Sequence, residues 1–217
     1  MNIRERDYLL DFKKKYVEGC PICFGKNLKC TCQEKLQLEI KKIKANIPLK
    51  YCDFTNFTLK KADLLNYVSH LKENLQTGQG LYLYGGVGSE SIKSVAYILT
   101  KALEQNYTAE FIQFGDCIAL STKSWYSEDV YFQGVVNLLD ANFLVMDDVG
   151  SEYKKELATA VFDGIFRERC HRLNATLMIS HVNWDEVGTY YGNKVKGLFE
   201  EHMKPILLPG VQIRNGN

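Results

Sequence analysis

Four cysteines near the amino terminus have the residue type and the spacing of a metal site. Cys20, Cys23, Cys30 and Cys32 follow the pattern C-x2-C-x6-C-x-C. Zn²⁺ binds four thiolates tetrahedrally in structural sites, and a segment of about 45 residues has too little core to fold without such a cross-link. Because C-x-C is a less usual pair than C-x2-C, a thiol redox pair and unligated loop cysteines stay open as alternatives. We expect these four cysteines to bind Zn²⁺.

A glycine-rich segment is a second candidate site. The apolar run 81–84 (LYLY) continues into Gly85, Gly86, Gly88 and Ser89, and a helical pattern follows. Glycines let successive backbone N–H groups surround an anion, and the amino terminus of a helix adds the positive end of its dipole. These residues are therefore candidate ligands for the phosphates of ATP or ADP with Mg²⁺.

The residues after this turn depart from the P-loop pattern G-x-x-x-x-G-K-[ST]. Where the pattern requires glycine, lysine and Ser/Thr, the chain has Glu90, Ser91 and Ile92. Lys93 and Ser94 stand two positions late, and two residues turn a helical side chain by about 200°. Two interpretations stay open: a turn that no longer holds ATP, and a loop longer by two residues in which Lys93 and Ser94 bind the nucleotide.

Two acidic residues end another apolar run. Asp147 and Asp148 directly follow residues 143–146 (FLVM). In phosphoryl-transfer enzymes a carboxylate holds Mg²⁺ and another side chain orients the nucleophile. An Asp-Asp pair also suits a simple turn, but the preceding glycine-rich segment favours the catalytic interpretation for both residues.

The elements that must position these residues alternate along the chain. Strand-like runs at 81–84, 110–114, 143–146 and 176–179 are separated by helical patterns such as 95–103 and 157–166. This alternation predicts an α/β fold with a largely parallel sheet and helices on both faces.

The first 45 residues form a separate segment in this prediction. Residues 3–17 and 33–45 read as short helices on either side of the cysteine cluster, and Pro48 then interrupts the chain. We therefore expect a small basic segment at 1–45 and the α/β domain at 46–217.

Charge and composition limit the function classes. Residues 1–50 hold 12 Lys and Arg against 6 Asp and Glu, whereas the remaining residues hold 15 against 20. Such a basic segment suits an anionic partner or a solvated helical surface. No apolar run approaches the roughly 18 residues that a membrane span needs, and no secretory signal begins the chain, so we expect a cytoplasmic protein. The remaining cysteines, Cys52, Cys117 and Cys170, are expected to be buried apolar residues.

In their order along the chain, these features resemble the AAA+ helicase loaders of bacteria and phages, the DnaC/DnaI family, with its transposition relative IstB. The resemblance covers roughly residues 17–217, its most specific part is the Asp-Asp pair, and the cysteine cluster is similar to one in many phage members. The residues that carry it are 47–51 (IPLKY), 53–57 (DFTNF), 81–84, the glycine turn, 144–150 (LVMDDVG), Glu152, Arg169, Thr176, 179–181 (ISH) and 209–214 (PGVQIR).

The resemblance implies an AAA+ P-loop NTPase-like sheet and an oligomeric, ATP-binding protein that grips the hexameric replicative helicase and delivers it to single-stranded DNA. It places His181 at the sensor position, which is usually an asparagine. The expected arginine-finger region, 192–199, has Lys194 and Lys196 but no arginine. Together with the altered P-loop, these departures predict weak or absent ATP hydrolysis, because an arginine finger alone contributes roughly 10³–10⁵ in rate.

The leading hypothesis is therefore a phage-related helicase loader or adaptor in DNA replication. Its basic segment would engage the helicase, and its α/β domain would self-associate or contact single-stranded DNA. Alternatives are an active ATP-dependent switch with a lengthened P-loop, a non-catalytic regulator of a host loader, and an IstB-like transposition helper. Arg167, Arg169 and Arg172 could reach a neighbouring subunit or DNA, although a solvated helix end would also explain at least two of them.

Overall fold

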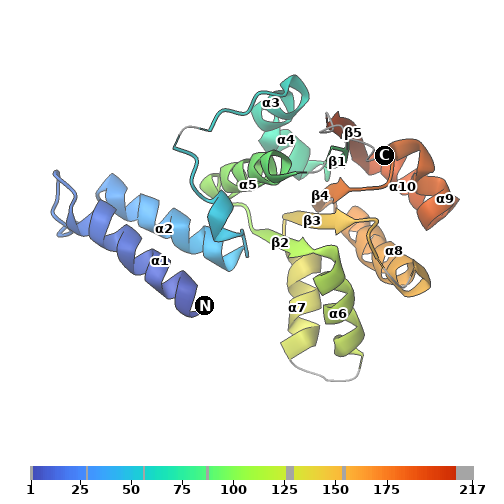
Figure 1. Ribbon diagram of the computed structural model, residues 1–217, viewed down its shortest axis with the longest axis horizontal. Coiled ribbons are helices and arrows are strands. Elements are labelled where there is room, and N and C mark those ends of the chain that lie inside the picture. The colour runs from blue at the N-terminus through green and yellow to red at the C-terminus, as the bar shows by residue number, and fades with distance from the viewer. Residues whose placement is uncertain are drawn as a thin grey trace, which may run out of the picture.

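A five-stranded parallel sheet forms the centre of the molecule (Figure 1). The computed structural model describes residues 2–27, 29–55, 57–86, 88–125, 130–152 and 155–208, without the side chains of Ser89 and Lys155. The strand order is β2-β3-β4-β1-β5. The strands are β1 (Gly80–Gly85), β2 (Ala109–Gln113), β3 (Phe143–Val149), β4 (Ala175–Ser180) and β5 (Met203–Leu208).

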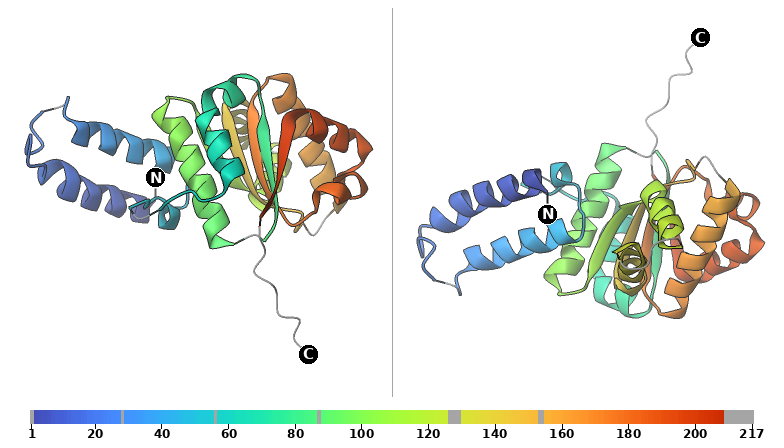
Figure 2. Two further views of the ribbon diagram at one scale, coloured as in Figure 1. Left: turned by 90° about the horizontal axis from the view of Figure 1, so that it is seen from above. Right: turned by 90° about the horizontal axis from the view of Figure 1, so that it is seen from below.

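Helices cover both faces of this sheet, as the sequence predicted (Figure 2). In β1, Leu81 and Leu83 face one hydrophobic core and Tyr82 faces the other, because side chains alternate along a strand. The first core is closed by α3 (Ala62–Ser69), α4 (Leu71–Gln76) and α5 (Ser89–Glu104). The second is closed by α6 (Phe114–Ser124), α7 (Val130–Asp140), α8 (Lys155–His171), α9 (Val187–Tyr191) and α10 (Asn193–His202).

Strand β5 was not predicted from the sequence. It contains Pro205, which lacks an N–H donor and usually argues against a strand. The strand is tolerated because β5 lies at the edge of the sheet and pairs only with β1.

The amino-terminal segment is a helical hairpin that projects from the body (Figures 1 and 2). It consists of α1 (Ile3–Lys13), a π-helical turn (Lys14–Glu18) and α2 (Thr31–Lys44). Asn2 caps α1 in a capping box with Glu5. All residues of α1 are described, and none of them is buried.

The carboxyl end of α2 is packed on the α/β body. Ala45 and Ile47 belong to the core beneath α5, and the backbone N–H of Phe111 donates to the carbonyl of Ala45 at 2.8 Å. The expected boundary near residue 46 thus falls within a stretch that already packs on the sheet. One helix therefore runs from the body to the cysteine cluster.

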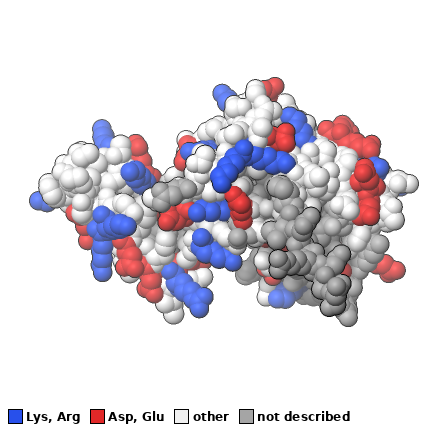
Figure 3. Space-filling model, turned by 45° about the horizontal axis from the view of Figure 1, so that its top comes forward, with Lys and Arg blue, Asp and Glu red and all other residues white. Residues whose placement is uncertain are grey.

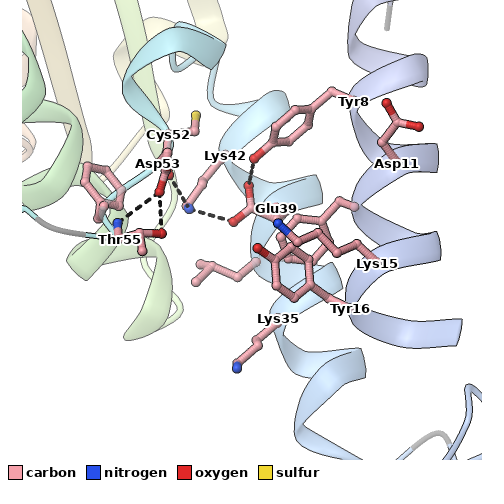
Figure 4. Close-up of a pocket in the computed structure, with 13 residues that line it drawn as sticks. Tyr8, Asp11, Lys15, Tyr16, Lys35, Glu39, Lys42, Cys52, Asp53 and Thr55 are labelled. Carbon is pink, nitrogen blue, oxygen red and sulfur yellow. Dashed lines mark hydrogen bonds and ion pairs between the residues drawn. The ribbon is translucent and has the colours of Figure 1, made fainter. Parts of the chain in front are cut away.

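A buried ion pair within α2 lies where the hairpin meets the body (Figure 4). Lys42 Nζ lies 2.7 Å from Glu39 Oε1, donates to the carbonyl of Cys52 at 3.3 Å and lies over the ring of Phe54. From α1, the Tyr8 hydroxyl donates to Glu39 Oε2 at 2.8 Å. Because Lys42 and Glu39 both belong to α2, the contacts of Lys42 with Cys52 and Phe54 attach this helix to the body.

Arg169 corrects one expectation from the sequence. It is 0% exposed and cannot reach a neighbouring subunit or DNA. Its guanidinium donates to Thr176 Oγ1 at 2.9 Å and to the carbonyls of Leu138, Ala141 and Ala175, so it joins α7, α8 and β4. Arg172, in contrast, is a solvated residue that pairs with Glu168 and Asp140.

Two further expectations can be compared with the fold. Cys52, Cys117 and Cys170 are buried, as expected. Among the described residues, we find no helix long and apolar enough to cross a membrane.

Candidate nucleotide site and metal centre

The glycine turn between β1 and α5 is short. Gly85 has φ 95°, and a Cβ there would lie 2.7 Å from Leu207 Cδ1, so the position requires glycine. The next N–H, that of Gly86, donates to the carbonyl of Leu208 at 3.1 Å. After Gly88, α5 begins at Ser89, so only residues 86–88 separate the strand from the helix. Val87 and the side chain of Ser89 lie outside the described part of the chain, as does the motif at 209–214.

The polar side chains that follow the turn form contacts within the protein. Ser91, at the position of the P-loop lysine, donates its hydroxyl to the carbonyl of Gly86 at 3.3 Å. Lys93 Nζ lies over the ring of Phe57, 5.4 Å from its centroid, and the Ser94 hydroxyl donates to the carbonyl of Glu90 at 2.9 Å. The two extra residues that a lengthened loop would need lie within α5 instead.

Asp147 and Asp148 occupy the carboxyl end of β3 in different environments. Asp147 is 6% exposed, and its Oδ1 accepts the N–H of Asp148 at 2.9 Å. Burial raises the pKa of Asp147, and the charge of Asp148 adds to this against the opposing charges of His181 and Lys50. Asp148 has φ 63°, which turns its half-exposed side chain toward His181.

His181 connects the ends of β3 and β4. Its Nε2 lies 2.9 Å from Asp148 Oδ1, and its backbone N–H donates to the carbonyl of Val149 at 2.9 Å. Since β4 lies between β3 and β1, His181 stands on the strand that separates the two aspartates from the glycine turn. All of these groups therefore lie at the carboxyl edge of the sheet, where open α/β folds bind ligands.

The cysteine cluster has the geometry of a tetrahedral metal site. The four Sγ atoms of Cys20, Cys23, Cys30 and Cys32 all lie within 4.8 Å of one another. Cys20 and Cys30 are 3.8 Å apart at sulfur, and Cys23 and Cys32 are 3.4 Å apart. Four sulfurs at 2.3 Å from a zinc ion would be about 3.8 Å apart, so the donor set fits.

The thiols of the cluster have pKa values shifted in opposite directions. The N–H groups of Cys23 and Ile22 lower the pKa of Cys20, and chiefly the N–H of Asn27 lowers the pKa of Cys23 to about 6. Desolvation and the neighbouring sulfurs raise the pKa of Cys32 to about 12. This opposition is expected of four thiols brought together without a cation, and a bound metal would relieve it.

Comparisons with known proteins agree with this architecture. No protein-family model and no curated protein sequence matches the chain. Among solved structures, the crystal structure of DnaI matches with a TM-score of 0.64 at 14% identity, over 75% of this chain and 94% of DnaI. The crystal structure of the DnaC helicase loader matches with a TM-score of 0.62 at 17% identity, over 75% of this chain and 100% of DnaC. This chain has the fold of DnaI and DnaC.

A third match is AMPPCP-bound DnaA from Aquifex aeolicus, with a TM-score of 0.55 at 18% identity over 75% of this chain and 52% of DnaA. The expected α/β fold with a parallel sheet is thus confirmed, and it is the fold of these three proteins. The cysteine cluster at the amino terminus fits a zinc knuckle added to the DnaC/DnaI-like body.

Sequence reasoning assigned no contact to several residues that support this site, although Lys50, Tyr82, Glu152 and Ser180 belong to the motifs quoted for the resemblance. The Tyr82 hydroxyl hydrogen-bonds with Ser180 Oγ at 2.7 Å beneath His181. After β3, Glu152 Oε1 accepts the N–H of Gly150 at 2.9 Å and the hydroxyl of Tyr191 at 2.7 Å. Lys50 influences Asp147 from a distant part of the chain. The contacts of Tyr82, Tyr191 and Lys50 could not be predicted, because their partners are far away in sequence.

Proposed function

We propose that this chain is a helicase loader or adaptor in DNA replication with weak or absent ATP hydrolysis. It would hold or deliver the hexameric replicative helicase for single-stranded DNA in the cytoplasm. One observation carries the proposal: a body with the fold of the DnaC helicase loader bears a projecting hairpin that ends in a cluster of four cysteines with room for a metal ion. Neither part alone would distinguish a loader from other AAA+ proteins.

In this proposal the hairpin, residues 1–45, is the helicase-docking segment and carries Zn²⁺ on Cys20, Cys23, Cys30 and Cys32. Helix α2 is continuous between the cysteine cluster and the body, and the contacts of Lys42 with Cys52 and Phe54 attach it to the body. A helicase subunit bound to the hairpin would therefore be held at a defined position relative to the body at 46–217.

In this proposal the chain hydrolyses ATP weakly or not at all. Gly85, Gly86, Gly88 and Ser89 would hold any bound phosphate, with Lys93 and Ser94 contributing only if α5 unwinds by a turn. Asp147 would hold Mg²⁺, and Asp148 with His181 would orient water.

Three observations favour weak hydrolysis. The Gly86 N–H is paired with β5, Ser91 replaces the P-loop lysine, and Lys93 contacts Phe57. Equilibrium binding of a fluorescent ATP analogue with Mg²⁺ tests this point. We expect no binding up to millimolar nucleotide, and micromolar binding would favour the ATP-dependent switch.

The experiment for the docking role is capture of the replicative helicase from the organism that encodes the chain. We expect the immobilised full-length protein to retain the helicase and the double variant Cys20→Ser, Cys23→Ser to lose it. The matched control Cys170→Ser removes a buried body thiol and should retain capture. Intact capture by the double variant would exclude the hairpin as the docking segment.

The altered nucleotide site also suits a regulator that mixes into the oligomer of an intact loader. The same capture experiment separates the two functions. Retention of a host loader in preference to the helicase would favour the regulator, whereas retention of the helicase with loading onto single-stranded DNA would favour the loader.

A further inference from the structure

The cysteine cluster contains two close pairs of sulfur atoms. Cys23 Sγ lies 3.4 Å from Cys32 Sγ, and Cys20 Sγ lies 3.8 Å from Cys30 Sγ. A disulfide needs its two sulfurs about 2 Å apart, so either pair can form one after a small shift. The sequence left metal binding and thiol redox chemistry open as alternatives for these cysteines. The geometry allows both on the same four residues, one after the other.

The cluster is also better placed for oxidation than the other thiols. Cys23 is half-buried, whereas the three thiols of the body are buried. Between residues 19 and 33 the chain has Lys26 and Lys29 and no acidic residue, and Figure 3 shows this end of the molecule as a largely uncharged surface with basic side chains at its border. Reactive cysteines lie in electropositive, partly exposed surroundings, whereas buried ones are inert. Oxidation should therefore begin at Cys23 and spare the body.

The far end of the hairpin depends on these cysteines for its structure. Its buried cluster of described residues consists of Val17 and three of the four cysteines. Phe24 has φ 49°, a left-handed conformation that is unfavourable for a bulky residue and persists where the surrounding structure imposes it. Ile22 is 79% exposed and Phe24 is 68% exposed, and both lie between the cysteines. A change in the bonding of the cysteines would therefore rearrange two exposed apolar side chains.

We propose that the cysteine cluster is a peroxide-sensitive metal site, in which a disulfide between Cys23 and Cys32 forms at the cost of Zn²⁺ binding and rearranges the hairpin tip. This inference rests on the proposed function, because it takes the hairpin as the zinc-bound docking segment. It adds a regulation to that function: capture of the helicase is lost under oxidising conditions and regained after reduction.

The oxidant in this proposal is hydrogen peroxide, and the reaction has two steps. The Cys23 thiolate attacks one peroxide oxygen, so that an S–O bond forms, the O–O bond breaks, and hydroxide leaves and takes up a proton. The Cys32 thiolate then attacks Cys23 Sγ, an S–S bond forms, the S–O bond breaks, and a second hydroxide leaves as water. Two thiolates are oxidised by two electrons in all, and one peroxide with two protons is reduced to two water molecules. The two thiolates that remain do not complete a four-ligand zinc site.

Zinc release from the full chain tests the chemistry. The protein is purified with Zn²⁺ under reducing conditions, and its metal content is measured. Hydrogen peroxide is then added stepwise in the presence of a chromogenic chelator that is too weak to remove the metal from the untreated protein. We expect one Zn²⁺ per chain at the start and its release with the loss of two thiols. Since the chain has seven cysteines, the count of free thiols in denaturant should fall from seven to five.

Peptide mapping of the oxidised wild type identifies the bond. Tryptic cleavage after lysine separates peptide 16–26, with Cys20 and Cys23, from peptide 30–35, with Cys30 and Cys32. After one equivalent of peroxide these two peptides should be joined, and their fragmentation in the mass spectrometer should locate the bond between Cys23 and Cys32. Dithiothreitol followed by Zn²⁺ should restore the metal content and the thiol count, because a disulfide is a reversible stage of cysteine oxidation.

The matched control is Cys170→Ser, which removes a buried thiol of the body and should release Zn²⁺ at the wild-type rate. Capture of the helicase is then compared for the reduced, the oxidised and the re-reduced wild type. We expect the affinity to fall by about tenfold or more when Zn²⁺ is lost and to return when it is restored.

The outcomes separate this inference from the proposed function. A purified chain without Zn²⁺ would overturn the metal site itself. Bound Zn²⁺ that survives excess peroxide, or oxidation of the body thiols ahead of the cluster, would refute the switch alone. Oxidation to sulfinic or sulfonic acids, which dithiothreitol does not reverse, would also refute it, as would unchanged capture by the oxidised chain. If the reduced chain fails to capture the helicase, the docking role is wrong, whereas reversible release of Zn²⁺ would still support the peroxide-sensitive site.

Discussion

At the scale of single residues, the two neighbouring aspartates show how burial separates the properties of identical side chains. Asp147 is withdrawn into the end of β3, whereas Asp148 is half exposed and paired with His181. A buried carboxylate weakens a fold unless its charge is fully compensated, and functional residues often impose this cost.

We expect Asp147→Asn to stabilise the protein at pH 7. The pKa of Asp147 is raised in the folded state, so stability falls as pH rises from the unfolded value, about 3.9, through the folded value. Asparagine has no charge to bury, so the variant should keep the stability that Asp147 loses at pH 7. For a protein of this size, each kcal/mol of stability changes Tm by about 2–4 °C, so we expect Tm at pH 7 to rise by a few degrees. Calorimetry at pH 7 and below pH 4 checks the effect, which should vanish in acid. Asp148→Asn is the control with little effect, and a lower Tm for Asp147→Asn would contradict the prediction.

For Arg169 we expect the opposite effect, a loss of stability on substitution, because its buried charge has many hydrogen-bond partners. Arg169→Ala would leave Thr176 Oγ1 and the carbonyls of Leu138, Ala141 and Ala175 without their donor. We expect a loss of about 3–5 kcal/mol in the free energy of unfolding, measured by urea titration. Arg172→Ala removes a solvated arginine that directly follows the same helix, and it should change stability by no more than about 0.5 kcal/mol. Equal effects of both variants would refute the structural role of Arg169.

At the scale of elements, the glycine turn between β1 and α5 lies where a phosphate site would be expected, but the side chains of the P-loop pattern are absent from it. Glu90, Ser91 and Ile92 lie in the first turn of α5, where the P-loop pattern has glycine, lysine and Ser/Thr. The turn is therefore present, and we expect its ability to bind a nucleotide to depend on the residues at these three positions.

We expect the triple variant Glu90→Gly, Ser91→Lys, Ile92→Thr to gain micromolar binding of a fluorescent ATP analogue with Mg²⁺. The matched control Glu90→Gly, Ser91→Ala, Ile92→Thr lacks the lysine and should remain weak. Lys93→Ala should leave the wild type unchanged, because Lys93 contacts Phe57. A tenfold loss of affinity in Lys93→Ala, about 1.4 kcal/mol, would instead support the lengthened loop.

At the scale of the whole molecule, the body and the hairpin are stabilised differently. The sheet is enclosed by two large hydrophobic cores, whereas at the far end of the hairpin the buried cluster of the described residues consists of Val17, Cys20, Cys30 and Cys32. A bound metal would therefore contribute most of the stability of the knuckle, while apolar burial stabilises the body.

Removal of the metal should release the hairpin and leave the body folded. After chelation we expect faster amide hydrogen exchange in residues 3–18 and unchanged protection of β1, β3 and β4, measured by mass spectrometry. Lower pH should have the same effect, because cysteine thiols lose their protons when they bind a metal, and the thiolates are protonated again in acid. Loss of protection throughout the sheet would show that the metal stabilises the whole chain.

The sequence by itself determined those features that depend on neighbouring residues. Periodicity predicted four of the strands and the helices α1, α2, α5 and α8, cysteine spacing predicted the cysteine cluster, and glycines predicted the turn at Gly85. The α/β class could be predicted for the same reason, because alternating strands and helices constrain the sheet to be parallel. The resemblance to DnaC and DnaI also rests on short local motifs, which the shared fold now supports.

Only the tertiary structure decided features that depend on distant partners. Only the structure shows that Arg169 is buried and that Lys93 lies over Phe57. It also shows that Pro205 lies in an edge strand and that Lys50 lies close enough to Asp147 to affect its pKa. It also carried α2 onto the body and left Phe24 exposed at the far end. The physical reason is common to all of these residues: local propensity determines the type of an element, whereas packing between elements determines which side chains are withdrawn from water and which remain available to bind.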